Sequence, residues 1–133
     1  MSKTITLDNT AARAEHIAER LFPHQVEGVA FLLKRRRAIL ADDMGLGKTR
    51  QAIIALHVNE RGGPFLVVCP ASVKQNWARE ITTALPDATV RIISGKSDDA
   101  PLDAQWVVVN YDVLGAHLKR LAAQPWRGMV FDE

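Results

Sequence analysis

The sequence predicts an α/β protein built on a parallel sheet with helices on both of its faces. Short apolar runs alternate with helical periodicity along the chain, which is the element order of repeated strand and helix units. Within these runs the apolar residues are consecutive, as in strands that are buried on both faces. The chain has 133 residues, of which 47% are hydrophobic and 24% charged, so it is long enough for one domain with a buried core.

The predicted strands are short segments rich in β-branched and aromatic residues, separated by helical or loop sequence. They are Ala38–Ala41, Phe65–Cys69, Thr89–Ile93, Trp106–Val109 and Met129–Phe131. Glycine, proline and three aspartates lie between Gly95 and Gln105, and this segment is predicted to be a loop. Residues 1–10 are not assigned to a helix or strand.

The first two predicted helices flank the first strand. One opens at Pro23, and its apolar face has the spacing i, i+3, i+4, i+7. This face is formed by Val26, Val29, Ala30 and Leu33. The other follows Lys48 and ends before Gly62, Gly63 and Pro64. Its apolar residues are Ala52, Ile53, Ala55 and Leu56.

Two further helices are predicted in the second half of the chain. Ser72 and Gln75 have the spacing of a capping box at the start of the third. Its apolar face is formed by Val73, Trp77, Ile81 and Leu85. The fourth starts at Asp112 and ends before Pro125. It carries Leu114, Leu118 and Leu121.

Charge and cysteine content narrow the function classes only a little. The net charge of +2 neither indicates nor excludes a nucleic-acid partner. The single cysteine, Cys69, cannot form an internal disulfide, and no run approaches the roughly 18 apolar residues of a membrane span. Because the chain start also lacks the apolar stretch of a secretion signal, we expect an intracellular protein, cytoplasmic or nuclear, with no membrane partner.

The strongest chemical signal is AILADDMGLGKT, residues 38–49, where a predicted strand leads through glycines into a helix. Gly45 and Gly47 can turn successive amides toward phosphates, Lys48 can reach the β and γ phosphates, and the Thr49 hydroxyl can bind Mg²⁺. The helix N-terminus adds partial positive charge. The candidate phosphate loop therefore comprises Asp43, Met44, Gly45, Leu46, Gly47, Lys48 and Thr49.

Two alternatives to a phosphate loop come from the same segment. The first glycine of the usual pattern is replaced by Asp42, so the segment could be a simple strand-to-helix turn. A dinucleotide-binding turn would begin at Gly45, but its third glycine would fall on Arg50, which argues against it.

The second signal is MVFDE, residues 129–133, an apolar strand that ends in two carboxylates. Ligands bind at the carboxyl ends of strands in open α/β sheets. Asp132 would hold Mg²⁺, and Glu133 would orient or deprotonate the attacking water. On its own the MVFDE segment is a weak signal, because solvated acidic residues commonly follow strands. The candidate phosphate loop upstream favours the interpretation of Asp132 and Glu133 as site residues.

Together these segments resemble the first lobe of the superfamily-two helicases, and more narrowly the Swi/Snf-type DNA-dependent ATPases. LFPHQVEGVAFLL resembles the Q motif, and ILADDMGLGKT resembles motif I with the acidic pair that this family has in place of the first glycine. FLVVCPASVKQNWARE resembles motif Ia, VVVNYDVL the next DNA-facing motif, and FDE the start of motif II. The resemblance implies a RecA-like lobe, incomplete at its C-terminus, over residues 21–133, preceded by a partly helical N-terminal extension over residues 1–20.

The resemblance also implies roles for single residues. Gln25 would read the adenine edge, because an amide both donates and accepts, and Phe22 would help to position the base. A solvated helix position for Gln25 and core packing for Phe22 are the alternatives. DNA contacts would come from Ser72, Lys74, Asn110 and Tyr111, although Ser72 could instead cap its helix and Tyr111 could cover the sheet.

The expected function is therefore that of an ATP-binding lobe of an ATP-dependent DNA translocase, which uses ATP and Mg²⁺ and binds duplex DNA without sequence preference. In the family, a second RecA-like lobe, which this chain lacks, supplies arginine fingers, so we expect the chain alone to be inactive or very weak. The resemblance further implies that a later strand normally lies between the motif I and motif II strands, so we expect a gap at the sheet centre. The alternatives are another P-loop NTPase or kinase, and a nucleotide-binding module without turnover.

Overall fold

The computed structural model describes residues 3–7, 38–42, 46–59 and 62–132, and within these the chain forms one mixed sheet. The order of its strands is β1-β2-β6-β3-β5-β4. The strands are β1 (Lys3–Leu7), β2 (Ala38–Asp42), β3 (Phe65–Cys69), β4 (Val90–Ile92), β5 (Trp106–Asn110) and β6 (Gly128–Asp132). All neighbours pair in parallel except β1, which pairs antiparallel with β2 at the edge.

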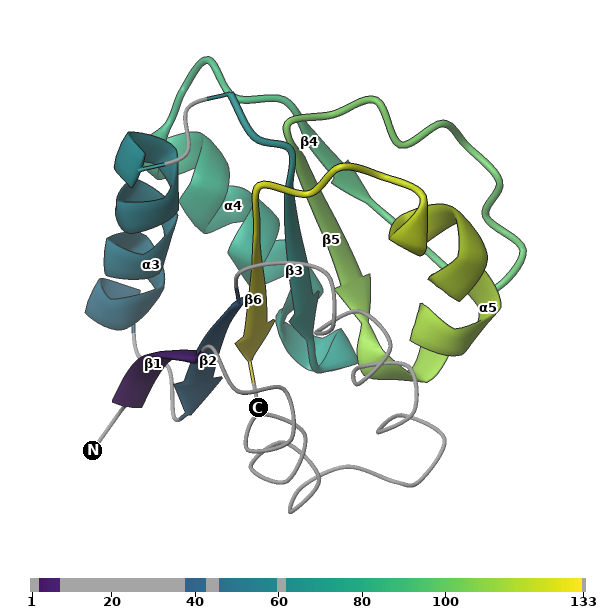
Figure 1. The fold of residues 1–133 in the computed structure, drawn as a ribbon, viewed down its shortest axis with the longest axis horizontal. Coiled ribbons are helices and arrows are strands. Elements are labelled where there is room, and N and C mark those ends of the chain that lie inside the picture. The colour runs from purple at the N-terminus through teal and green to yellow at the C-terminus, as the bar shows by residue number, and fades with distance from the viewer. Residues whose placement is uncertain (1–2, 8–37, 43–45, 60–61, 133) are drawn as a thin grey trace.

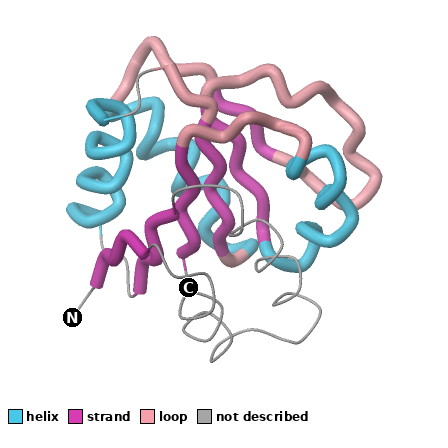
Figure 2. The backbone as a smooth tube through the Cα atoms, viewed as in Figure 1, coloured by secondary structure: helices cyan, strands magenta, loops and turns pink. Residues whose placement is uncertain are grey.

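Helices cover both faces of this sheet, as the sequence predicts. The helix α3 (Leu46–Asn59) and the helix α4 (Lys74–Ala84) lie on one side, and α5 (Tyr111–Ala122) lies on the other (Figure 1). The same layering is visible where the helices flank the strands in Figure 2. The predicted α/β fold class is confirmed. The predicted helix opening at Pro23 lies outside the described residues.

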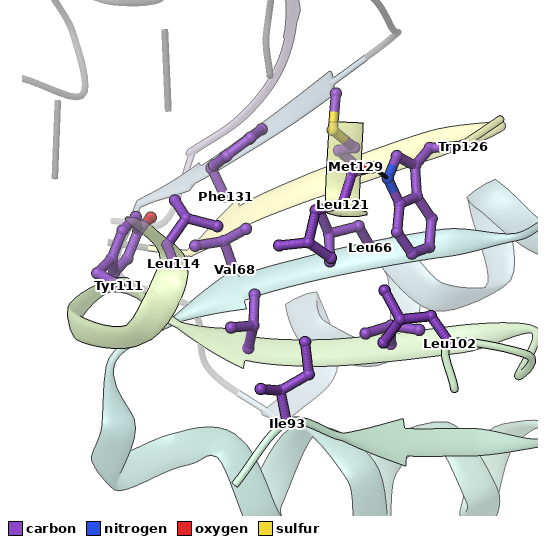
Figure 3. Packing of buried hydrophobic residues seen from close by; sticks show 12 residues of the cluster. Leu66, Val68, Ile93, Leu102, Tyr111, Leu114, Leu121, Trp126, Met129 and Phe131 are labelled. Carbon is purple, nitrogen blue, oxygen red and sulfur yellow. Dashed lines mark hydrogen bonds between the residues drawn. The ribbon is translucent and has the colours of Figure 1, made fainter. Parts of the chain in front are cut away.

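The core has two halves, one on each face, because side chains alternate along buried strands. In β6, Val130 packs with Ile53 of α3 and Trp77 of α4, whereas Met129 and Phe131 belong to the cluster under α5 (Figure 3). β3 and β5 are fully buried along their whole length and alternate in the same way. Consecutive apolar residues in the sequence therefore supply both clusters at once.

The described strands agree closely with those that the sequence predicts. The strand Phe65–Cys69 matches at both ends, and the others differ by one residue at one or both ends. β1 has no counterpart among the predicted strands, and the rest of the predicted N-terminal extension lies outside the described residues.

The expected gap at the sheet centre is wrong. β2 and β6 pair directly in parallel, with Ala38 opposite Met129 and Ala41 opposite Asp132. On its other side β6 pairs with β3. The two strands close on each other because an open backbone edge inside a sheet would leave N–H and C=O groups without partners.

The described helices begin and end near the predicted residues, with two local differences. α3 begins at Leu46, two residues before Lys48, and after it the chain passes through Gly62 (φ 84°) and Gly63 (φ 64°), a backbone region that favours glycine. The capping box is wrong. Ser72 lies inside a short 3-10 helix, Ala71–Val73, and α4 follows with Val73 at its N-cap and no side-chain cap.

The predicted loop between β4 and β5 is confirmed, and side chains hold it in place. Asp98 accepts hydrogen bonds from the amides of Ser94 and Ala100 and pairs with Arg91 at 2.6 Å. These amides hold the pKa of Asp98 well below its usual range. Arg120 of α5 donates to the carbonyl oxygens of Asp98 and Ala100.

Within the described residues no helix combines the length and the apolar character needed to cross a membrane.

Candidate active site

The carboxyl ends of β2, β6, β3 and β5 lie along one edge of the sheet, at the bottom of the view in Figure 1. In parallel α/β sheets this edge is where ligands bind. β2 leads from this edge into α3, and β6 ends beside it at Asp132. Because Ala41 and Asp132 are register partners, the acidic strand end is adjacent to the strand that precedes the candidate phosphate loop.

Thr49 lies in the first turn of α3 and is buried, with 3% of its surface exposed. Leu46, Gly47 and Lys48 form the start of the same helical turn. The first amides of a helix have no intrahelical partners and carry partial positive charge. Because α3 begins at Leu46, the Leu46 and Gly47 amides of the candidate phosphate loop belong to the helix end that favours anions.

Asp132 is directed toward the face that carries α3 and α4, since it follows Val130 by two positions along the strand. Its Oδ2 accepts a hydrogen bond of 2.8 Å from Nε1 of Trp77, and only 7% of the residue is exposed. Burial raises the pKa of the Asp132 carboxyl, and the hydrogen bond from Trp77 opposes part of that rise.

The indole of Trp77 is the site feature that sequence reasoning missed. The helical spacing places Trp77 correctly on the buried face of its helix, but periodicity carries no information about where an indole N–H points. A signal was nevertheless available, because a buried indole N–H normally has an acceptor.

Cys69 ends β3 next to these groups and is fully buried. Burial raises the pKa of its thiol to about 12, and the negative charge of Asp132 adds to the rise while Lys74 opposes it. A thiol that stays protonated is a poor nucleophile and a poor metal ligand. Cys69 is therefore a packing residue in this site.

The donor set at this edge fits Mg²⁺. Mg²⁺ prefers oxygen ligands and is typically held by one or two protein groups together with phosphates. The Thr49 hydroxyl and the Asp132 carboxylate are such oxygens, and both belong to elements that meet at the same sheet edge.

The four residues predicted to contact DNA differ in exposure. Ser72 is exposed, and Lys74 is partly buried with its Nζ donating to the carbonyl oxygen of Ile93 at 3.0 Å. Asn110 and Tyr111 are each 5% exposed. Tyr111 packs in the cluster under α5 (Figure 3), whereas Oδ1 of Asn110 has no hydrogen-bond partner among the described residues.

Several predicted site residues lie outside the described residues, and their roles stay predictions. They are Phe22, Gln25, Asp43, Met44, Gly45 and Glu133. For Lys48 the structure gives the position in α3 and not the placement of the ammonium group.

Comparison with known proteins places the chain in a family. The model of the SNF2-related domain matches residues 24–133. A SWI/SNF-related matrix-associated actin-dependent regulator of chromatin, subfamily A-like protein 1 homolog from Caenorhabditis elegans is 38% identical over 122 residues. That alignment covers 88% of this chain and 18% of the relative. The human DNA annealing helicase and endonuclease ZRANB3 is 35% identical over 112 residues, 80% of this chain and 10% of the relative.

A solved structure supports the same relationship. The SWI2/SNF2 ATPase core of Sulfolobus solfataricus, in complex with double-stranded DNA, superposes with a TM-score of 0.59 and 31% identity. The match covers 86% of this chain and 26% of that core. The chain thus spans less than a fifth of the length of these two curated relatives. With a family model that covers most of its residues and a matching fold, the chain belongs to the SNF2-related domain family.

Proposed function

We propose that the chain is the ATP-binding lobe of an ATP-dependent DNA translocase of the Swi/Snf type, which couples ATP hydrolysis to movement along duplex DNA. One observation carries the proposal. Buried Thr49 at the start of α3 and buried Asp132 at the end of the neighbouring strand lie at the same sheet edge, in a chain of the SNF2-related family.

Different residues of the chain are proposed to bind different parts of the nucleotide. Lys48 and the amides from Asp43 to Thr49 bind the phosphates, and Gln25 and Phe22 bind the adenine. The Thr49 hydroxyl and the Asp132 carboxylate hold Mg²⁺, and Glu133 orients the attacking water. When bound, Mg²⁺ supplies positive charge that offsets the charge on the phosphate oxygens during transfer.

The proposed DNA contacts lie at the start of α4 and the end of β5. Exposed Ser72 and the Lys74 ammonium can meet phosphates at the start of α4, where helix amides also favour anions. Asn110 and Tyr111, at the end of β5 and the start of α5, are proposed to contribute further DNA contacts. The relative of known structure was solved with double-stranded DNA, which supports a duplex partner.

Turnover is proposed to require a second RecA-like lobe. In phosphoryl-transfer enzymes an arginine from a partner domain is worth about 10³ to 10⁵ in rate. The 133-residue chain is therefore expected to bind Mg²⁺ and nucleotide but to hydrolyse ATP very weakly. Steady-state hydrolysis with and without duplex DNA, compared with a longer two-lobe version, tests this, and strong DNA stimulation of the 133-residue chain would contradict it.

Calorimetry with ADP and Mg²⁺ tests the nucleotide site directly. Lys48→Ala removes a charge-assisted contact to phosphate and is expected to weaken binding by about 10-fold to 100-fold. Lys119→Ala removes the same charge from an exposed position on α5 and serves as the matched control. Equal affinities in Lys48→Ala and the control would refute the assignment of the phosphate loop.

A further inference from the structure

Trp77 and Asp132 are 55 positions apart in the sequence and meet in the interior of the protein. Trp77 is 1% exposed and Asp132 is 7% exposed, and the Nε1–Oδ2 distance is 2.8 Å. A hydrogen bond from a neutral donor to a buried carboxylate is charge-assisted and stronger than one between neutral groups. The bond therefore restricts the orientation of the carboxylate through Oδ2.

The choice of acceptor sets Trp77 apart from another buried tryptophan. The indole of Trp126 is 3% exposed and donates to the backbone carbonyl of Leu121 at 2.6 Å. That bond satisfies the indole without involving a charged group, and it lies in the cluster under α5 (Figure 3). Trp77, by contrast, donates to the acidic side chain of the proposed nucleotide site.

The helix that carries Trp77, α4, also forms an ion pair with α3, the helix that carries Thr49. One turn further along α4, Glu80 pairs with Arg50 of α3 at 3.1 Å. Residues three positions apart share a helix face, so Trp77 and Glu80 face the site elements together. α4 is thus tied to α3, which carries Thr49, and to β6, which carries Asp132.

We propose that Trp77 is a positioning residue of the nucleotide site, whose indole N–H holds Oδ2 of Asp132 and so would keep the carboxylate in the orientation in which it holds Mg²⁺. The inference rests on the proposed function, because it takes Asp132 as a group that holds Mg²⁺. Partners that orient the ligands of a metal commonly contribute 10-fold to 100-fold in metal affinity. Trp77 has the geometry of such a partner.

The variant Trp77→Phe tests the proposal, because it keeps an aromatic ring in the core and removes only the donor. Trp126→Phe is the matched control, since it removes an equivalent buried indole hydrogen bond on the other face of the sheet. Both variants lose packing and one hydrogen bond, so an effect that arises from general loosening of the fold appears in both.

The measurement is ADP affinity as a function of Mg²⁺ concentration, by calorimetry on the 133-residue chain. Trp77→Phe is expected to need about 10-fold to 100-fold more Mg²⁺ for the same ADP affinity, with metal-free ADP binding unchanged. Trp126→Phe is expected to follow the wild type. If the wild type responds to Mg²⁺ and the two variants behave alike, the positioning role is refuted while the proposed function stands. If the wild type shows no Mg²⁺-dependent ADP binding, the proposed function fails and this inference fails with it.

A second readout is made on the wild-type protein, and variants serve only to assign its resonances. The indole N–H groups of the three tryptophans give separate resonances in a ¹⁵N-labelled wild-type sample, and Trp106→Phe and Trp126→Phe identify the Trp77 resonance by elimination. Addition of Mg²⁺ to the ADP complex is expected to shift the Trp77 resonance and to leave that of Trp126 in place. A Trp77 resonance that does not move at saturating Mg²⁺ and ADP overturns the proposal, even where Trp77→Phe fails to fold.

Discussion

The buried groups at the end of β6 and β3 show how burial decides the chemistry of single residues. Asp132 and Cys69 are both acids in a region with little water, and burial raises the pKa of each. The Asp132 carboxyl accepts a hydrogen bond from the Trp77 indole, which favours the charged carboxylate. The Cys69 thiol lies near the negative charge of Asp132, which disfavours the charged thiolate. One acid is therefore equipped to carry charge and the other is not.

The thiol gives a prediction for alkaline pH. In the unfolded chain the Cys69 thiol has its ordinary pKa of 9.0, but in the folded protein burial raises that pKa to about 12. Above pH 9.0 the folded state binds the extra proton, so stability falls with pH by up to about 1.4 kcal/mol per unit from this group. The difference in unfolding free energy between wild type and Cys69→Ala, measured in urea from about pH 8 to about pH 10.5, should drift accordingly. A constant difference across that range would contradict the buried, neutral thiol.

The preference for one nucleotide base tests the role proposed for Gln25. If Gln25 reads adenine, ATP should compete for the site better than GTP or CTP, and Gln25→Ala should remove that preference. The lost amide contact should cost about 1 to 3 kcal/mol, which competition binding resolves. Gln75→Ala changes an exposed amide on α4 and should leave selectivity intact. If Gln25→Ala keeps the preference for ATP over GTP and CTP, Gln25 does not read the adenine base.

The sequence predicts a helix or strand correctly where the segment's own composition decides its structure. Both ends of the strand FLVVC are predicted correctly, because five consecutive apolar residues favour a strand that is buried on both faces. Asp132 is likewise predicted directly after a buried strand, at the carboxyl edge of the sheet, and the structure places it at the end of β6 on that edge.

What the sequence does not predict depends on distant partners or local competition. β1 has the sequence KTITL, whose alternation becomes a strand only because the edge of β2 is available. The capping spacing of Ser72 is overridden because a 3-10 turn brings the chain from β3 into α4. The Trp77–Asp132 bond joins elements 55 positions apart, which no local pattern records.

The contact between α3 and α4 gives a stability prediction. The Glu80 side chain is 8% exposed and depends on Arg50, whose side chain is 49% exposed. Arg50→Ala should lower the free energy of unfolding by about 1 to 3 kcal/mol, because it leaves a buried carboxylate without its partner. Adding Glu80→Met should recover part of that loss, because the buried charge is then gone.

Urea denaturation measures both variants, and Arg79→Ala provides a control on the exposed side of α4. Surface substitutions of this kind usually stay within about 0.5 kcal/mol. If Arg50→Ala costs no more than Arg79→Ala, the ion pair does not stabilise the contact between the two helices.

For the whole molecule, a net charge of +2 means that DNA affinity must come from where the charges lie and not from their sum. Binding to duplex DNA should be weak, indifferent to sequence and steeply dependent on salt. Lys74→Ala should reduce the salt slope by at most about 0.9, the value of one phosphate contact. The hydrogen bond to Ile93 uses only one of the three ammonium donors, so a phosphate contact is compatible with it.

Fluorescence anisotropy with labelled duplexes of two unrelated sequences, over a series of salt concentrations, measures both quantities. Lys119→Ala, on the far side of the sheet, should keep the wild-type slope. An affinity that is equal at low and physiological salt would rule out phosphate contacts as the source of binding.

The position of β6 also sets the order in which the protein can assemble during synthesis. β6 lies between β2 and β3 in space, yet it is the last described strand to leave the ribosome. Until residue 128 emerges, the β1–β2 pair and the group β3–β5–β4 share no hydrogen-bonded edge. Asp132 arrives on the strand that joins them, so the nascent chain acquires its proposed Mg²⁺ ligand in the same event that joins the two groups of described strands. A partly synthesised chain would carry the candidate phosphate loop without the group proposed to hold its metal. We therefore expect it not to bind Mg²⁺–nucleotide until β6 has paired with β2 and β3.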